Sequence, residues 1–245
     1  MQTALESVRA DGGALLDIGA GLSREQWQAP SGCAGWRVQD VVTHLANLFW
    51  LLADPGRLPP LDGLPTEQAQ ETAVRARRGM SGPAALADYA ESRGPALDRL
   101  AELAALDLEV PLGDLGTYPA ALLPAAYSFD HYTHIRADLF PPRGPLPGPP
   151  PQSDAARLAS VLDWIEAALP QQNPAAAAAC TLELEVTGTG ARSIPFGSGG
   201  PAATISSGGP ALIRWVTQRG TWAELGVQTA GDPAALAVAR TLKVF

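Results

Sequence analysis

The sequence has few of the features that mark several large classes of protein. Of its 17 basic residues only Lys243 is a lysine, and with 25 acidic residues the formal net charge is −8. Because nucleic-acid binding needs clustered cations, an acidic chain with no basic run argues against DNA or RNA as a partner. No stretch approaches the roughly 18–20 apolar residues of a membrane helix, and the N-terminus has no signal-peptide pattern. We therefore expect a soluble cytoplasmic protein that does not engage membranes.

Cysteine is also scarce, because Cys33 and Cys180 are the whole complement, too few for a disulfide scaffold. Glycine and proline are abundant, with 25 and 23 residues. They lie between segments with periodic apolar residues, so they separate elements and do not indicate disorder. Heavy use of Ala, Gly and Pro, with arginine in place of lysine, is typical of a genome rich in G and C.

Residues 1–170 are predicted to be helical, because apolar residues recur there every three or four positions. The clearest case is the run from Val38 to Leu52, which Asp54-Pro55-Gly56 ends. The segment 141–152, with seven prolines, is expected to form a stiff strap. The helices are expected near residues 5–22, 38–52, 66–78 (weak), 83–103, 119–140 and 158–169.

After about residue 178 the apolar period changes from helical to alternating. Residues 181–187 place every second side chain on one face, which predicts a half-buried strand. Shorter strands are expected at 193–196 and 203–206, and helices after Pro210 and Pro233. The predicted fold class is therefore α+β, with a helical bundle at residues 1–170 and a small α+β domain at 178–245.

The first candidate for chemistry is His44, which lies between Val41 and Leu48 on the buried face of its helix. An unpaired buried imidazole costs about 1–3 kcal/mol, so His44 needs a partner. Two interpretations stay open at this point. His44 is either a core histidine hydrogen-bonded to a carbonyl or hydroxyl, or a metal ligand.

A second pair of polar residues changes that balance. Asp130 and His134 are one helical turn apart and continue an inner stripe that begins with Leu123 and Tyr127. A metal compensates for polar residues on a face that should be core, and His44 would complete three ligands. Three protein ligands plus an open position is the pattern of a catalytic zinc site.

Two further residues near His134, His131 and Asp138, are candidates for a role at the metal site. His131 also points near His134, so a set of His44, His131 and His134 is geometrically possible. The other interpretation of His131 is a flanking residue outside the ligand set. Asp138, one turn beyond His134, would suit an orienting carboxylate for a histidine ligand. Alternatively, Asp138 pairs with Arg136 or Arg143 at the helix end.

The segment 30–45, PSGCAGWRVQDVVTHL, resembles the signature of the mycothiol-dependent maleylpyruvate isomerase family, which belongs to the DinB-like superfamily of metal-binding bundles. The family pattern has a Cys-x-Gly-Trp entry to a helix, a histidine ending the motif, and then a carboxylate and a histidine four apart. Residues 211–222 and 231–236 resemble its small, sterol-carrier-protein-like C-terminal domain. The resemblance implies an up-down four-helix bundle followed by that domain.

The resemblance also implies an enzyme, an isomerase or S-transferase, acting on a small electrophile. Its cofactors would be a divalent metal, zinc or alternatively nickel, and a low-molecular-weight thiol, mycothiol or bacillithiol. The thiol is the implied nucleophile, so no protein nucleophile is expected and Cys33 marks the turn into the helix. Asp130 stands where the family has a glutamate, and Gln218-Arg219 where it has Gly-Arg.

Within this resemblance, Arg214 or Arg219 would anchor a carboxylate of the thiol or substrate, and surface solubilisation is the alternative. A monomer or weak homodimer is expected. The competing hypothesis for the whole chain is a non-catalytic metal- or ligand-binding protein of the same fold.

Overall fold

The computed structural model describes residues 2–245, which form two compact units. Unit 1 runs to Glu109 and includes Pro119–Gln152, and unit 2 comprises Val110–Tyr118 and Ser153–Phe245.

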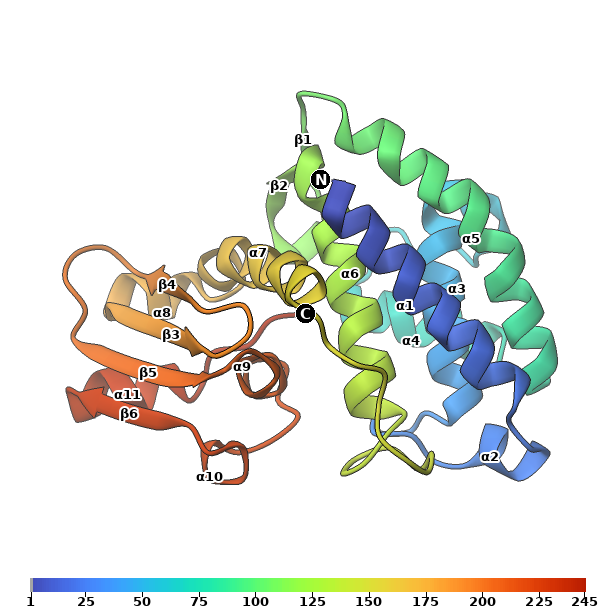
Figure 1. The fold of residues 1–245 in the computed structure, drawn as a ribbon. Coiled ribbons are helices and arrows are strands. Elements are labelled where there is room, and N and C mark those ends of the chain that lie inside the picture. Colours follow the sequence, from blue (N-terminus) through green and yellow to red (C-terminus); the bar gives the residue numbers. More distant parts are fainter. Residues whose placement is uncertain (1) are drawn as a thin grey trace. The chain divides into compact units, whose positions relative to one another are not determined.

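Unit 1 is a four-helix bundle (Figure 1). Its helices are α1 (Gln2–Ala20), α3 (Val38–Ala53), α5 (Gly82–Ala104) and α6 (Leu123–Thr133). Glycines inside α1 permit its close approach to α5, since a Cβ at Gly19 would lie 2.6 Å from a methyl carbon of Leu86. A Cβ at Gly12 would lie 2.7 Å from the hydroxyl of Tyr89. These glycines weaken the helical pattern of the sequence but are what the packing needs.

Helix α3 supplies the centre of the bundle and confirms the helix expected at 38–52. It begins after Arg37, where the backbone N–H of Arg37 donates to the Asp40 carboxylate at 2.9 Å. Its first thirteen residues, Val38 to Trp50, are all buried. It ends at Ala53, before the 3-10 turn η1 (Pro55–Arg57), because proline cannot continue the hydrogen-bond ladder.

The weak polar helix expected near residue 66 is α4 (Thr66–Ala76). Only Ala73 and Val74 of α4 are buried, so few apolar contacts hold it against the bundle. Polar contacts add to them, because Arg77 directly after α4 donates to Asn47 at 2.7 Å and pairs with Asp88 at 2.5 Å.

Helix α6 continues into a π-helical turn, η4 (His134–Asp138). Such wide turns are rare in proteins, and those that occur often lie at functional sites. Arg136 on this turn forms a buried, two-pronged ion pair with Asp11 of α1, at 2.8 and 2.9 Å. Its guanidinium also donates to the carbonyls of Pro151 and Gln152 at the end of the proline-rich strap. One arginine therefore fastens both the turn and the strap to the bundle.

Unit 2 is built on a four-stranded sheet of order β4-β3-β5-β6. Strand β3 pairs antiparallel with β4 and parallel with β5, and β5 pairs antiparallel with β6. Alternate residues Leu182, Leu184 and Val186 of β3 are buried, which confirms the alternation expected there. The strands are β3 (Leu182–Thr187), β4 (Arg192–Phe196), β5 (Ala203–Gly208) and β6 (Gln228–Gly231).

Helices pack on this sheet, and short elements complete the chain. Helix α7 (Ala155–Gln172) contacts both β4 and α9 (Gly209–Val216), and α11 (Pro233–Ala239) contacts β5 and β6. The remaining elements are α2 (Arg24–Gln28), β1 (Glu109–Pro111), η2 (Gly113–Leu115), β2 (Thr117–Pro119), η3 (Ala120–Leu122), α8 (Pro174–Ala179) and α10 (Trp222–Leu225).

The division between the units falls at Gln152, whereas the sequence suggested a bundle extending to residue 170. The difference is α7, which packs on β4 of the sheet and on α9. Its contact with α9 is close, because a Cβ at Gly209, the first residue of α9, would lie 3.2 Å from a methyl carbon of Leu158. An amphipathic stripe predicts that a helix buries one face, but the stripe does not identify the partner.

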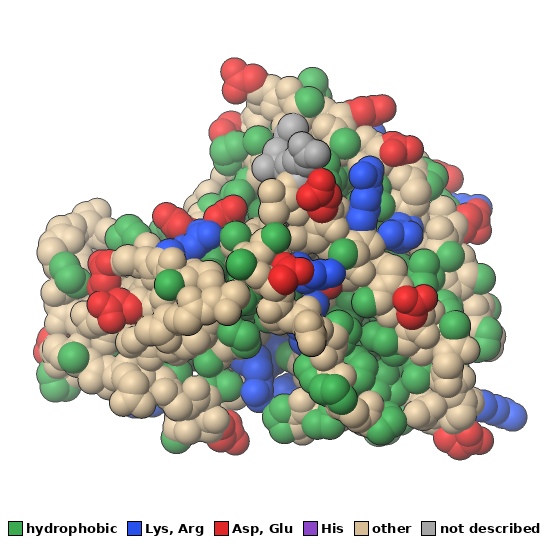
Figure 2. Space-filling view, viewed as in Figure 1, with side chains coloured by type: hydrophobic (Ala, Val, Ile, Leu, Met, Phe, Trp, Pro, Cys, Tyr) green, Lys and Arg blue, Asp and Glu red, His purple; other side chains and the backbone are tan. Residues whose placement is uncertain are grey.

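On the face drawn in Figure 2, acidic and basic side chains are interspersed over both units. Among the residues that the structure describes, no helix is long and apolar enough to cross a membrane.

Candidate functional site

Three of the residues singled out in the sequence meet inside unit 1. His44 of α3, Asp130 of α6 and His134 at the start of η4 offer ligand atoms that all lie within 4.8 Å of one another. The two imidazole rings lie edge to face, with centroids 4.7 Å apart. Both histidines are buried, and the Asp130 side chain is 31% exposed. The cluster thus has one side open to solvent.

The ring of His44 is held from α4. Nδ1 of His44 lies 3.2 Å from Oε1 of Gln70, so this nitrogen carries the proton and donates it to the amide oxygen. The other ring nitrogen, Nε2, then has the lone pair that a metal requires.

The ring of His134 is held within its own turn. Nδ1 lies 2.8 Å from Oδ2 of Asp138, while Nε2 lies 3.9 Å from Oδ1 of Asp130. Sγ of Cys33 lies 3.6 Å from the same Nδ1. Burial disfavours the charged ring, but the interactions with Cys33 and the hydrogen bond to Asp138 outweigh it and raise the pKa of His134 to about 10.

Cys33 reaches His134 because the loop before α3 lies directly on η4. The backbone N–H of Gly32 donates to the carbonyl of Asp138 at 2.8 Å. A Cβ at Gly32 would lie 2.8 Å from Cα of Asp138, so only glycine fits this approach without a shift. Arg143 of the strap donates to the carbonyl of Gly32 at 2.5 Å.

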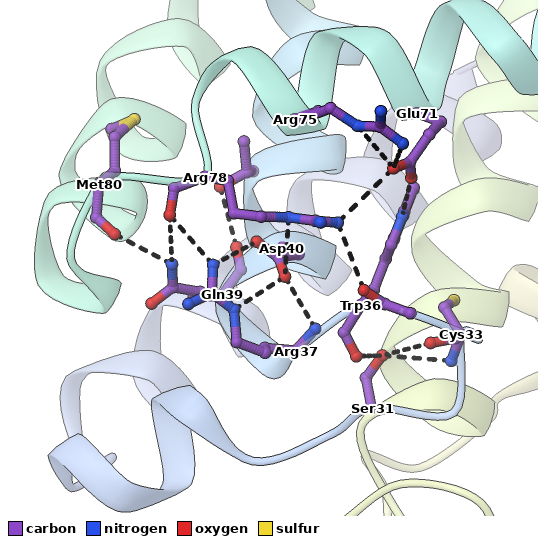
Figure 3. A network of polar contacts seen from close by, with 12 residues as sticks. Ser31, Cys33, Trp36, Arg37, Gln39, Asp40, Glu71, Arg75, Arg78 and Met80 are labelled. Atoms are coloured by element: carbon purple, nitrogen blue, oxygen red, sulfur yellow. Dashed lines mark hydrogen bonds and ion pairs between the residues drawn. The ribbon is translucent and has the colours of Figure 1, made fainter.

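Trp36, the last residue of this loop before Arg37, packs on both histidine rings. Its ring centroid lies 5.2 Å from that of His44 and 6.4 Å from that of His134. The indole N–H donates to Glu71 of α4 at 2.7 Å (Figure 3). This hydrogen bond lowers the pKa of Glu71, as do Arg75 and Arg78 beside it. The indole is thereby fixed between the histidines and α4.

The structure does not bring His131 to this cluster. His131 is fully buried, with Nδ1 2.8 Å from the carbonyl oxygen of Tyr127 and Nε2 2.9 Å from the hydroxyl of Tyr89. Nδ1–H therefore donates to the carbonyl, and the hydroxyl donates to Nε2. Burial lowers the pKa of His131 to about 4, so the ring is neutral. Both ring nitrogens are engaged, and His131 takes the flanking role that was its other interpretation.

The two arginines suggested by the resemblance lie in unit 2. Arg214 of α9 donates to the carbonyl of Arg219 at 3.2 Å, and the N–H of Arg219 donates back to the carbonyl of Arg214 at 2.7 Å. Gln218 between them has a φ of 59°, a left-handed conformation that is uncommon for a residue other than glycine. Their role in binding a thiol or substrate stays a prediction.

The donor set of the cluster fits a divalent metal. Two imidazoles, which are neutral when they ligate a metal, and one carboxylate, contributed by α3, α6 and η4, are ligands that zinc takes in catalytic sites. Each histidine also has a partner on its other nitrogen, Gln70 for His44 and Asp138 for His134, as metal-ligating histidines almost always do.

Sequence reasoning missed Gln70, and it treated Cys33 as part of a turn only. One signal for Gln70 was available, because Ala73 and Val74, the buried residues of α4, follow it at three and four positions. No local pattern places Cys33 beside a histidine 101 residues later.

The fold and the cluster together define a class of helical-bundle proteins that carry a histidine–carboxylate site, here built from α3, α6 and η4. Residues 8–140 match the family described as mycothiol maleylpyruvate isomerase N-terminal domain. The chain belongs to this family.

Two solved structures have a similar fold over 94% of this chain and 93% of theirs, each with a TM-score of 0.62. They are the mycothiol-dependent maleylpyruvate isomerase, at 19% sequence identity, and a histidine-to-alanine mutant of a protein of that name, at 17%. No protein of curated function matches the sequence.

Proposed function

We propose that this chain is a metal- and thiol-dependent enzyme that isomerises, or transfers a thiol to, a small electrophile. The observation that carries the proposal is the convergence of His44, Asp130 and His134, with ligand atoms within 4.8 Å of one another. Membership of the isomerase family and the shared fold support mycothiol as the thiol and a maleylpyruvate-like compound as the substrate.

His44, Asp130 and His134 would hold the metal, for which zinc suits the donor set best. When bound, such an ion acts as a Lewis acid that binds the sulfur of the thiol and lowers its pKa. No cysteine of this chain is needed as the nucleophile, because the thiol supplies the attacking sulfur.

The chain's own residues then position the reactants. Gln70 and Asp138 accept from Nδ1 of His44 and His134, which would leave the Nε2 atom of each ring to ligate the metal. The indole of Trp36, fixed by Glu71, covers both imidazoles with an apolar wall and excludes water from that side. Asp130, at the solvent side of the cluster, marks the direction from which the thiol and the electrophile enter.

For isomerisation, the thiolate adds to one carbon of a cis double bond conjugated to a carbonyl, and the π electron pair moves onto that carbonyl as an enolate. The resulting single bond rotates, and return of the electron pair expels the same thiolate and restores the double bond as trans. The thiol is regenerated, so no net oxidation occurs. In S-transfer the thiol stays on the product. The two outcomes share the site and differ only in whether the carbon–sulfur bond breaks again.

The test is a metal and activity analysis of protein purified without a histidine tag. We expect about one zinc per chain, loss of that zinc in His44→Ala, and mycothiol-dependent conversion of maleylpyruvate to its trans isomer. Assays with bacillithiol in place of mycothiol identify the thiol that the enzyme uses. Assays with an epoxide in place of maleylpyruvate distinguish thiol transfer from isomerisation. Protein without metal, with His44→Ala unchanged from the wild type, would contradict the proposal.

A further inference from the structure

The two histidines of the cluster are oriented by partners of different charge. His134 is held by a carboxylate, Asp138, at 2.8 Å, whereas His44 is held by a neutral amide, Gln70, at 3.2 Å. A histidine that ligates a metal through Nε2 must keep its proton on Nδ1, and the acceptor at Nδ1 decides this. Gln70 therefore has a defined task at the proposed metal site.

Gln70 is placed for this task by contacts on both sides of it along α4. Glu71, the next residue, accepts the indole N–H of Trp36 at 2.7 Å and pairs with Arg75 at 3.0 Å. Beyond the end of the helix, Arg77 is bonded to Asn47 of α3 at 2.7 Å. Because α4 is fastened to the loop and to α3, the amide of Gln70 is held against His44 before any ligand arrives.

The charges around the cluster explain why an amide is used here. A divalent cation would meet the carboxylates of Asp130 and, behind His134, of Asp138, which also lies 4.0 Å from the guanidinium of Arg143. A carboxylate at position 70 would add one more negative charge to this group before an anionic sulfur binds. A carboxylate partner makes an imidazole a more basic and stronger ligand, but its charge opposes a further anion a few ångströms away.

We propose that Gln70 is a positioning residue that fixes the tautomer of His44 for metal binding and, by being neutral, preserves the affinity of the site for a thiolate. The inference rests on the proposed metal site. It predicts that removing the acceptor and charging it have different effects, which a residue needed only for folding would not produce.

The experiment compares Gln70→Leu and Gln70→Glu with the same two changes at Gln68, an exposed residue of the same helix. Zinc affinity is measured by competition with a chelator, and thiol binding by the sulfur-to-metal absorption of the cobalt-loaded protein on titration with mycothiol. We expect Gln70→Leu to weaken zinc binding by about 10- to 100-fold. We expect Gln70→Glu to retain or strengthen zinc binding while weakening mycothiol binding by about tenfold. The changes at Gln68 should alter neither quantity.

Equal zinc affinity in Gln70→Leu and the wild type would overturn the positioning role. Weaker zinc binding in Gln70→Glu would also overturn it, since that result requires the amide to donate to His44. Unchanged mycothiol affinity in Gln70→Glu would overturn the role of neutrality. A wild-type protein that binds zinc through His44 but gives no sulfur band contradicts the thiol chemistry alone. The comparison of Gln70→Leu with Gln68→Leu then still decides the positioning role.

Discussion

Two histidines three residues apart, at the end of α6 and the start of η4, have opposite surroundings. His131 lies between Tyr89 and the backbone of Tyr127, fully buried, with a pKa lowered to about 4. His134 lies between two carboxylates and a thiol, with a pKa raised to about 10. Burial acts in the same direction on both rings, so the neighbouring acids, and not the depth, separate them.

The comparison shows what distinguishes a structural histidine from a candidate ligand. Around His131 each ring nitrogen has one protein partner with good geometry, which leaves no lone pair for a metal. Around His134 one nitrogen is held by Asp138 and the other faces Asp130 and His44, from a different helix. Two histidines only three residues apart can therefore lie in different environments, one in the core of the bundle and the other in the candidate site.

The largest expected effect comes from exchanging the two histidines for alanine. His134→Ala should weaken zinc binding by about 1,000-fold, or about 4 kcal/mol. His131→Ala should keep the zinc stoichiometry but lower the free energy of unfolding by about 3 kcal/mol, because it leaves a cavity and an unpaired Tyr89 hydroxyl. Chelator competition and urea unfolding of the metal-free proteins measure the two quantities. A folded His131→Ala protein that binds no zinc would return His131 to the ligand set.

A smaller effect is expected from pH, and the two histidines should contribute with opposite signs in the metal-free protein. The folded-state pKa of His131 is below the ordinary value of 6.5, so the unfolded chain binds more protons between pH 6.5 and pH 4. The contribution of His131 to the free energy of unfolding is therefore present above pH 6.5. It is lost as the pH falls, by about 2 kcal/mol between pH 7 and pH 4.5. For His134 the folded-state pKa is raised, so its contribution is present below pH 6.5 and is lost as the pH rises toward 10.

Urea unfolding from pH 4.5 to pH 9 measures these contributions, with His131→Gln and His134→Gln as the variants in which each one is absent. His131→Gln should flatten the acid side of the stability profile and leave the alkaline side unchanged. An identical acid slope in His131→Gln and the wild type would mean that other groups produce the loss.

Sequence periodicity was sufficient to predict which of these side chains share a helix face. The 3–4 spacing that aligns Asp130 and His134 with Leu123 and Tyr127 holds in the structure, where the hydroxyl of Tyr127 donates to the carbonyl of Leu48 in α3 at 3.0 Å. This prediction succeeds because a helix has one period, so positions along the chain determine directions around the axis. His44 is buried as well, but so is every residue from Val38 to Trp50, so its burial does not test which face of α3 it lies on.

What periodicity could not predict is which faces meet. The partner of His44 comes from α4, the thiol beside His134 comes from a loop 101 residues earlier, and α7 packs on the sheet of unit 2. Strand β6, QTAG, is exposed along its whole length, so it has no alternation by which the sequence could have shown it. Its pairing with β5 depends on backbone hydrogen bonds, which every residue type except proline can both donate and accept.

The smallest effect is expected from a change in the loop before α3, which covers His134 and has no equivalent at His131. In Gly32→Ala the new Cβ would meet Cα and Oδ1 of Asp138 at 2.8 Å, so the loop must move away from η4 and take Cys33 with it. We expect a loss of about 1 kcal/mol in the free energy of unfolding, as for mild overpacking, and faster labelling of Cys33 by a thiol reagent. The matched control is Gly13→Ala in α1, where a Cβ meets nothing within 4 Å and helix propensity should add a few tenths to about 1 kcal/mol. Urea unfolding and mass spectrometry of the labelled protein measure both. If Gly32→Ala leaves stability and Cys33 labelling unchanged, the loop does not shield His134, and the contrast with His131 reduces to the charges alone.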